Sequence, residues 1–483
     1  NMELYRHWKK NHPNFAAVTS LSEWGNEAHI FYNFNRFPRF AKQCGFTEQE
    51  AAEIRKRFPE VLPDREAYIN HRLKPFFERI QEIWYGDAKA LLALEGNWCI
   101  NHLAAYWGVG MVTMETSRSF ANWQVQLMFN RGAARQFDIP WGWYVASYLT
   151  AYSSQGKWVT DSEPAAFRKA ENWAPECGLS MSARERVFYM AYLAGANYFQ
   201  REDTDSNFWD ASKPAFQCWE PAEEAKVYIQ FHNFIRKFQD RGVPYTPIAF
   251  LVPKDRGSCR EIAKAFNRYP YLRSDNMVDG FIATLFPQEP VLPLLKKGVE
   301  ITLRNSKYGD VFDVLTPDFE KQEAFKRTLP LYKVAILLGR YRKSPEMAEI
   351  LRKYVADGGT LILNVSQLSS DFPSDFTGVR YNGDDFLSGN YRFGKIETCG
   401  ASVIATDEKN FPVFTQYSYG KGNVIVGTPH DLIPSFDETD PVAGDIVLGE
   451  TKSGARKFVF IEYLLDQLVK EVLPVTVEGD VQY

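Results

Sequence analysis

Residues 109–144 read VGMVTMETSRSFANWQVQLMFNRGAARQFDIPWGWY, and this stretch carries the most informative pattern of the chain. Residues 109–117 form a run rich in Val, Met and Thr that predicts a strand, and Glu115 stands at its carboxyl end. A polar turn follows, then residues 122–137 with helical spacing, then an aromatic run that predicts the next strand. Strand, helix and strand in this order predict a parallel pair, the repeating unit of α/β folds.

The same alternation continues on both sides of this stretch. Strands are expected at residues 15–24, 89–98, 109–117, 140–149 and 196–203. Helices are expected at residues 47–58, 66–84, 122–137 and 182–196. In a chain of this length the pattern favours a (β/α) TIM-like barrel. A closed barrel needs eight strands and only five can be counted, so either the N-terminus is truncated or some strands escape the pattern.

A second alternating block follows a helix expected at residues 221–239. Its strands are expected at residues 246–255, 308–318, 333–341, 359–366 and 421–429. A helix at 344–359 opens with Ser344 and Pro345 and stops at two glycines. This block predicts a smaller doubly wound, flavodoxin-like α/β domain with an inserted β-rich stretch at 370–415. We therefore expect a barrel over residues 1–240, an α/β domain over 241–470, and the start of a truncated β-domain over 471–483.

Composition excludes several classes of protein. The 483 residues carry a net charge of −4 without a basic block, so neither nucleic acid nor an anionic membrane is an expected partner. The sequence has no apolar run of about 18 residues, the length expected of a membrane span. The six cysteines form no CxxC pair and the seven histidines no HxH or HExxH motif. We therefore expect no metal site and no cofactor.

A lone acid at a strand end, close to aromatic side chains, suits the cleavage of carbohydrate. Sugars offer apolar ring faces for stacking and hydroxyl groups for hydrogen bonds. Glycoside hydrolysis needs two carboxyl groups that flank the bond. We expect Glu27 and Glu115, each near the carboxyl end of a predicted strand, to be this pair. The residues expected to bind substrate are Trp24, Asn26, Trp123, Gln124, Trp143 and Tyr144.

Each of these assignments has an alternative. Glu23, Glu95 and Glu202 also stand near predicted strand ends and could replace one of the two catalytic carboxylates. A single tryptophan is more often a core residue than a sugar platform. Arg131 and Arg135, one helical turn apart, predict either a tether for a carboxylate at the site or a structural ion pair, and the second is favoured. Gly132 between them predicts close packing of the helix on a strand.

Three segments resemble the β-galactosidases of glycoside hydrolase family 42 and their uncharacterised relatives. They are SEWGNEAHIFY at 22–32, METSRSFANWQ at 114–124 and SARERVFYMAYLAGANYFQ at 182–200. In the first, Asn26-Glu27 is similar to the Asn-Glu pair that bears the family's acid/base, and the second is similar to its nucleophile segment. The resemblance spans roughly residues 15–480. It implies a catalytic barrel joined to a domain similar to class I glutamine amidotransferases (GATase-like), followed by a β-sandwich.

The resemblance also implies a function and a setting. It implies a retaining glycosidase of bacterial carbohydrate metabolism that acts in polysaccharide degradation on a plant or microbial oligosaccharide such as a β-galactoside. It implies a homo-oligomer, with a trimer in relatives of this layout, and a periplasmic, secreted or cytoplasmic protein. The rival hypothesis is an inactive carbohydrate-binding or scaffold protein on the same fold. His430 stands where an amidotransferase histidine would stand, but no cysteine accompanies it in a suitable turn, so we expect a structural second domain.

Two features depart from the family pattern. The interval from Glu27 to Glu115 is shorter than the family's usual spacing between its two glutamates. A strand-like run at 140–149 also lies between Glu115 and the strand expected to be the last of the barrel. Glu115 is therefore expected one strand earlier than the family pattern would place its nucleophile.

Overall fold

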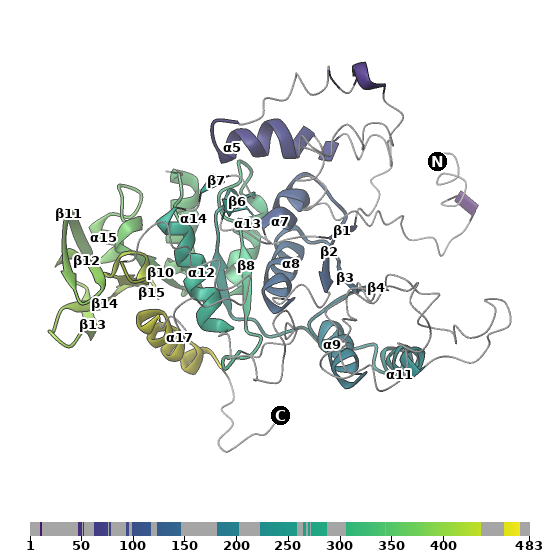
Figure 1. The fold of residues 1–483 in the computed structure, drawn as a ribbon. Coiled ribbons are helices and arrows are strands. Elements are labelled where there is room, and N and C mark those ends of the chain that lie inside the picture. Colours follow the sequence, from purple (N-terminus) through teal and green to yellow (C-terminus); the bar gives the residue numbers. More distant parts are fainter. Residues whose placement is uncertain are drawn as a thin grey trace, which may run out of the picture.

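The computed structural model describes a little over half of the chain. The described residues are 10–11, 47–50, 52, 62–75, 77–78, 93–95, 99–116, 123–145, 181–201, 223–257, 264–266, 269–270, 272–286, 306–342, 344–435 and 458–473. They form a mixed α/β structure built on two sheets (Figure 1). None of the helices in these ranges is long and apolar enough to cross a bilayer.

The first sheet has four parallel strands in the order β1-β2-β3-β4. The strands are β1 (Ala93–Glu95), β2 (Met111–Thr116), β3 (Trp141–Val145) and β4 (Tyr198–Arg201). Each lies inside a range that the sequence predicts as a strand. The fifth predicted strand, at 15–24, lies outside the described residues. A parallel sheet in chain order, with helices between successive strands, is the repeating pattern of (β/α) folds.

Helices connect and flank these strands. They are α5 (Arg65–Tyr68), which continues into the π-helix η1 (Ile69–Leu73), α7 (Cys99–Tyr106), α8 (Trp123–Phe137), α9 (Met181–Leu193) and α11 (Glu223–Lys237). The helices predicted at 66–84, 122–137, 182–196 and 221–239 correspond to α5 with η1, α8, α9 and α11. The helix α7 was not predicted, because the short interval between two strands is typical of a plain connection.

The second sheet has seven strands in the order β13-β14-β15-β10-β9-β5-β8. The strands are β5 (Ile248–Leu251), β8 (Phe312–Leu315), β9 (Val334–Leu337), β10 (Thr360–Asn364), β13 (Ser402–Thr406), β14 (Pro412–Tyr419) and β15 (Gly422–Gly427). The five strands β5, β8, β9, β10 and β15 are parallel, and in chain order they lie as 2-1-3-4-5. That order defines flavodoxin-like doubly wound sheets. All five fall within predicted strand ranges.

Both faces of the second sheet are covered, because alternate side chains of its strands point to opposite sides. Phe250, Phe312 and Ile336 share one core with α12 (Arg273–Leu285) and α17 (Val459–Val472). Leu251, Leu315 and Leu337 share the other core with α13 (Glu323–Thr328) and α14 (Pro345–Ala356). Strands that are buried on both faces consist of continuous apolar residues, which is why VAIL and TLIL predict this sheet directly.

The remaining elements are short or belong to the inserted stretch. They are β6 (Lys264–Ala265) paired with β7 (Tyr269–Pro270), the hairpin β11 (Val379–Ser388) and β12 (Tyr391–Thr398), α15 (Ser374–Thr377), and the 3₁₀ turns η6 (Leu329–Leu331), η7 (Val365–Gln367) and η8 (His430–Leu432). The β-rich insertion predicted at 370–415 is confirmed as β11 to β14.

Candidate active site

Glu115 occupies the fifth of the six positions of β2, close to its carboxyl end. The parallel register pairs Glu115 with Tyr144 on β3, and Tyr144 with Gln200 on β4. Positions 115, 144 and 200 therefore form one row across three neighbouring strands. In parallel α/β folds the carboxyl ends of strands carry the reactive groups, so this row is where a barrel site is expected.

The pleat of the sheet identifies the face on which this row lies. Val112 and Met114 alternate with Thr113 and are buried in the core that β2 shares with the flanking helices. Because successive residues of a strand point to opposite faces, position 115 shares the face of Thr113, away from that helical core. The face opposite the helices is the one that lines the interior of a (β/α) barrel.

Small and polar side chains mark the same face on the next two strands. Gly142 on β3 lies in register with Thr113, and an added Cβ there would lie 2.9 Å from the Tyr198 ring and 3.0 Å from the Thr113 methyl group. The Tyr198 hydroxyl donates a hydrogen bond to the side-chain oxygen of Gln200. Gly142 thus gives the tyrosine room, and the hydrogen bond fixes Gln200 in the row of Glu115.

Glu95 ends β1 and is paired in register with Thr113. Positions 95 and 115 therefore lie on the same face of neighbouring strands, offset by two residues. With about 4.8 Å between strands and about 3.3 Å per residue, their Cα atoms are about 8 Å apart. Positions 95 and 115 are thus neighbouring acidic positions on one face of the sheet.

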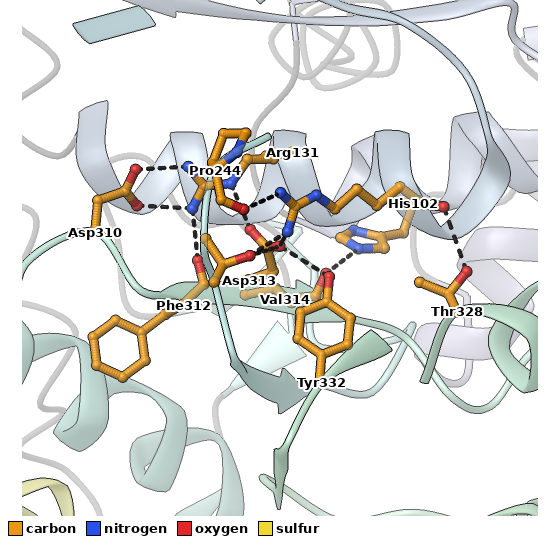
Figure 2. Close-up of polar contacts among 11 residues, drawn as sticks. His102, Arg131, Pro244, Asp310, Phe312, Asp313, Val314, Thr328 and Tyr332 are labelled. Carbon is orange, nitrogen blue, oxygen red and sulfur yellow. Dashed lines mark hydrogen bonds and ion pairs between the residues drawn. The ribbon is translucent and has the colours of Figure 1, made fainter. Parts of the chain in front are cut away.

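Arg131 of α8 points toward β8 of the second sheet, where it meets Asp310 and Asp313 (Figure 2). Arg131 is 1% exposed; its Nε lies 2.7 Å from Asp313 and its guanidinium also pairs with Asp310 at 2.6 Å. Arg135 lies 2.5 Å from the other Asp313 oxygen and also donates to the Pro244 carbonyl. Both arginines therefore form the structural ion pairs that the sequence favoured, so neither tethers a carboxylate in the candidate site.

The same helix covers the free edge of β8. The Gln136 amide both accepts from the Thr316 N–H, at 2.9 Å, and donates to the Thr316 carbonyl, at 2.8 Å. Nε2 of His102 lies 2.9 Å from the Val314 carbonyl, and burial lowers the pKa of this imidazole to about 4. These side chains satisfy backbone groups that an uncovered edge strand would leave unpaired. His102 is therefore a neutral packing residue rather than a ligand for a sugar hydroxyl.

The predicted site residues differ in how far the structure describes them. Those that lie outside the described residues are Glu23, Trp24, Asn26, Glu27 and Glu202. For Glu95, Glu115, Trp123 and Tyr144 the structure describes only the place in a helix or strand. Gln124 is partly exposed near the start of α8. Trp143 is 2% exposed and packs edge-on against Phe188, with 4.8 Å between the ring centroids. It is therefore a core residue and not a platform for sugar.

Two residues of this face were not singled out from the sequence, namely Tyr198 and Gln200. The available signal was the alternation in NYFQ, where Phe199 faces the apolar core and its two polar neighbours face the other way. The structure also places β3 between β2 and β4, as the run at 140–149 predicts. Glu115 is therefore separated from β4 by one intervening strand.

His430, which stands where an amidotransferase histidine would stand, contacts a residue of the β-rich insertion. Its Nε2 lies 2.9 Å from Asp385, and the Tyr381 hydroxyl donates to the same carboxylate oxygen at 2.6 Å. Burial raises the pKa of Asp385, but the hydrogen bonds from Tyr381 and His430 outweigh it and the pKa is lowered. Among the described cysteines, Cys399 lies between β12 and β13 and Cys99 begins α7, so neither follows a strand of the second sheet in a nucleophile turn.

Comparison with known proteins gives structural neighbours only. No family model matches the sequence, and no curated protein matches it. A β-galactosidase from Bacillus circulans sp. alkalophilus is similar with a TM-score of 0.45 and 14% identity, over 92% of this chain and 69% of that one. A catalytic mutant of a family 42 β-galactosidase from G. stearothermophilus has a TM-score of 0.45 and 12% identity, over 98% and 65%. An exo-β-1,4-mannosidase from Opitutaceae bacterium strain TAV5 has a TM-score of 0.43 and 16% identity, over 77% and 67%. The chain thus spans about two thirds of the length of these structures.

Proposed function

We propose that the chain is a glycoside hydrolase whose nucleophile is Glu115. The observation that carries the proposal is the row formed by positions 115, 144 and 200 at the carboxyl ends of three parallel strands. It combines an acid, an aromatic residue and an amide on the face opposite the helical core. That combination suits a sugar, which needs an attacking carboxylate, a ring face for stacking and hydrogen bonds to its hydroxyl groups.

In this proposal Glu27 is the acid/base and Asn26 hydrogen-bonds the sugar 2-hydroxyl. Glu115 attacks the anomeric carbon while Glu27 protonates the leaving oxygen, and water then releases the glycosyl group with Glu27 as base. The reaction retains the anomeric configuration. The first sheet belongs to a (β/α) barrel over residues 1–240. The second belongs to a GATase-like domain that stabilises a homo-oligomer; its last helix, α17, packs in the core of the second sheet and ends at Val472, so the boundary expected between 470 and 471 is wrong. The substrate class is an oligosaccharide such as a β-galactoside.

Glu95 is the strongest competitor for a catalytic role. Its place on β1, on the face of Glu115 and two residues lower, would allow Glu95 and Glu115 themselves to form the catalytic pair. If Glu27 and Glu115 are the catalytic pair, substitution of Glu27 removes activity. If Glu95 and Glu115 are the pair, substitution of Glu95 removes it and substitution of Glu27 does not.

The test measures hydrolysis of a panel of nitrophenyl glycosides by the wild-type chain and by Glu27→Ala, Glu95→Gln and Glu115→Ala. The exposed Glu408, in the turn before β14, provides the control Glu408→Gln. The proposal predicts loss of about 10³-fold or more in kcat for Glu27→Ala and Glu115→Ala, little change for Glu95→Gln, and wild-type rates for the control. Activity that survives Glu115→Ala would contradict it.

A second candidate function is a carbohydrate-binding or scaffold protein on the same fold. It predicts that the wild-type chain hydrolyses none of the glycosides but still binds oligosaccharides in calorimetric titrations. In that case Glu115→Ala would weaken binding without any effect on a rate.

A further inference from the structure

A cavity of about 920 Å³ opens at the carboxyl edge of the second sheet. The loops that follow β5, β9 and β10 line it, together with the first turn of α12, the turn η8 after β15 and Arg65 of α5. It thus lies where the strand order reverses, between β5 and β9. Doubly wound sheets bind their ligands at this switch point. None of the residues that line this cavity belongs to the first sheet, so it is distinct from the candidate active site.

Close backbone packing holds the floor of the cavity. Gly339 follows β9 with a φ of +83°, and a Cβ at this position would lie 2.9 Å from the Pro253 ring. The Gln367 side chain donates to the carbonyls of Leu337 and Gly339, at 2.9 Å and 2.8 Å. The loops after β5, β9 and β10 are therefore tied together before any ligand arrives, and a preformed site loses little conformational entropy on binding.

Some of the charged side chains that line the cavity form ion pairs with one another. Arg65 makes a bidentate pair with Asp275, at 3.0 Å and 2.7 Å, and both side chains are nearly buried. Arg273 lies 3.3 Å from Asp431, which also accepts from the Ser366 hydroxyl at 2.8 Å. Asp431 holds this place with a φ of 55°, a left-handed conformation that is uncommon outside glycine.

Other charged groups of the lining are left for a ligand. Among the described residues, Arg340, Asp255 and Asp371 line the cavity without an ion pair to any of them. Arg340 is exposed, and the other two are partly buried. Burial raises the pKa of Asp255, although Arg65 acts against this shift. The cavity thus offers one guanidinium and two carboxyl groups at the ends of three different strands.

The charge balance identifies the chemical class of the ligand. The described lining contains four arginines and four aspartates, so its formal charge is zero. The carboxylates would repel an anion, and the guanidinium groups would repel a cation. A polyol suits both, because each hydroxyl group donates to a carboxylate and accepts from a guanidinium. Tyr341, whose hydroxyl donates to the Leu251 carbonyl, adds a fixed and partly exposed ring for the apolar face of a sugar.

We propose that this cavity is a second, non-catalytic site that binds a neutral saccharide through Arg340, Asp255 and Asp371. The proposal goes beyond the glycosidase assignment and does not depend on it. The bound sugar bridges the loops that follow β5, β9 and β10. Its hydroxyl groups supply further hydrogen bonds to these side chains, which form no ion pair with the described residues.

The test is hydrogen–deuterium exchange of the full chain with galactose, mannose or xylose, and with inorganic phosphate as an anionic probe. None of these sugars can be hydrolysed, so a glycosidase activity does not disturb the measurement. The expected result is slower exchange at residues 252–257, 338–342 and 366–372 with at least one sugar and no effect of phosphate. In Arg340→Ala the sugar concentration for half protection rises about tenfold or more, because a charge-assisted hydrogen bond is lost.

Arg380→Ala is the matched control, because Arg380 is an exposed arginine on β11 that pairs only with the exposed Glu397 among the described residues. Its titration should equal that of the wild type. Protection by phosphate, no protection by any of the sugars, or equal titrations of Arg340→Ala and wild type would each overturn the proposal. Protection at 111–116 reports on the barrel site separately, so failure of one site is distinguishable from failure of the other.

Discussion

Gly132→Ala tests the close packing of α8 against the edge strand β8. A Cβ at position 132 would lie 1.8 Å from the carbonyl oxygen of Val314 and 2.8 Å from its carbonyl carbon. Real contacts of this kind are not shorter than about 3.2 Å, so helix and strand would have to separate by about 1.4 Å. The obstacle is backbone on both sides, so no side-chain rotation relieves it.

The cost of this separation can be worked from the contacts that α8 makes with β8. Overpacking a tight interface costs about 1–3 kcal/mol. A shift of that size also breaks the paired hydrogen bonds between Gln136 and Thr316, now 2.8 Å and 2.9 Å, at about 1 kcal/mol each. Alanine regains about 1 kcal/mol over glycine within a helix. We therefore expect a net loss of about 2–4 kcal/mol in the free energy of unfolding.

The assay is urea unfolding followed by tryptophan fluorescence, with Gly280→Ala as the control. Gly280 also lies in a helix, but the nearest atoms to a Cβ there belong to side chains, those of Ile433, Ile461 and Phe458 at 3.0 Å, 3.1 Å and 3.5 Å, and not to backbone. The control should therefore stay within about 1 kcal/mol of the wild type. A Gly132→Ala chain as stable as the wild type would refute the close packing of α8 on β8.

Three further substitutions test particular contacts. Burial and the neighbouring Asp255 raise the pKa of Asp318 to about 7, so the folded state holds a proton that the unfolded state releases near pH 4. Stability should therefore fall as the pH rises from about 4 to 7, and the difference between wild type and Asp318→Asn in urea midpoints should show this slope; a constant difference would contradict it. Arg131→Met leaves the fully buried Asp313 with one partner fewer and should cost about 3–5 kcal/mol in urea unfolding, and a loss below about 1 kcal/mol would mean that the pair is not buried as described. Ser344→Ala removes the hydroxyl that accepts from the Met347 N–H at the start of α14 and should lower the unfolding free energy by about 1 kcal/mol, whereas an unchanged melting curve would argue against the cap.

The elements that sequence patterns predicted well are those with a strong local signal. The strands VAIL and TLILN are continuous apolar runs, and Ser344 and Pro345 mark the start of α14 as they would in any protein. Gly132 predicted close helix–strand packing, and the structure confirms it. The partner of that contact, β8, lies about 180 residues further along the chain, and no local pattern reveals such a pairing.

The site was harder to predict because the row of Glu115 depends on register. Gln200 joins Glu115 only through β3, and strand spacing in the sequence does not define register. Trp143 has the composition of a sugar platform, but the pleat directs it into the core beside Phe188. The arginines of α8 likewise form ion pairs with Asp313 of β8 and with Asp310 just before it, and the sequence alone could not show that these residues are neighbours.

The most direct test of the proposed function is to trap the glycosyl–enzyme intermediate and locate it by mass spectrometry. The chain is incubated with the activated 2-deoxy-2-fluoro analogue of whichever nitrophenyl glycoside it hydrolyses, then digested and sequenced. The account predicts a single adduct on Glu115. An adduct on Glu95 or Glu202, or steady hydrolysis with inversion and no adduct, would contradict it.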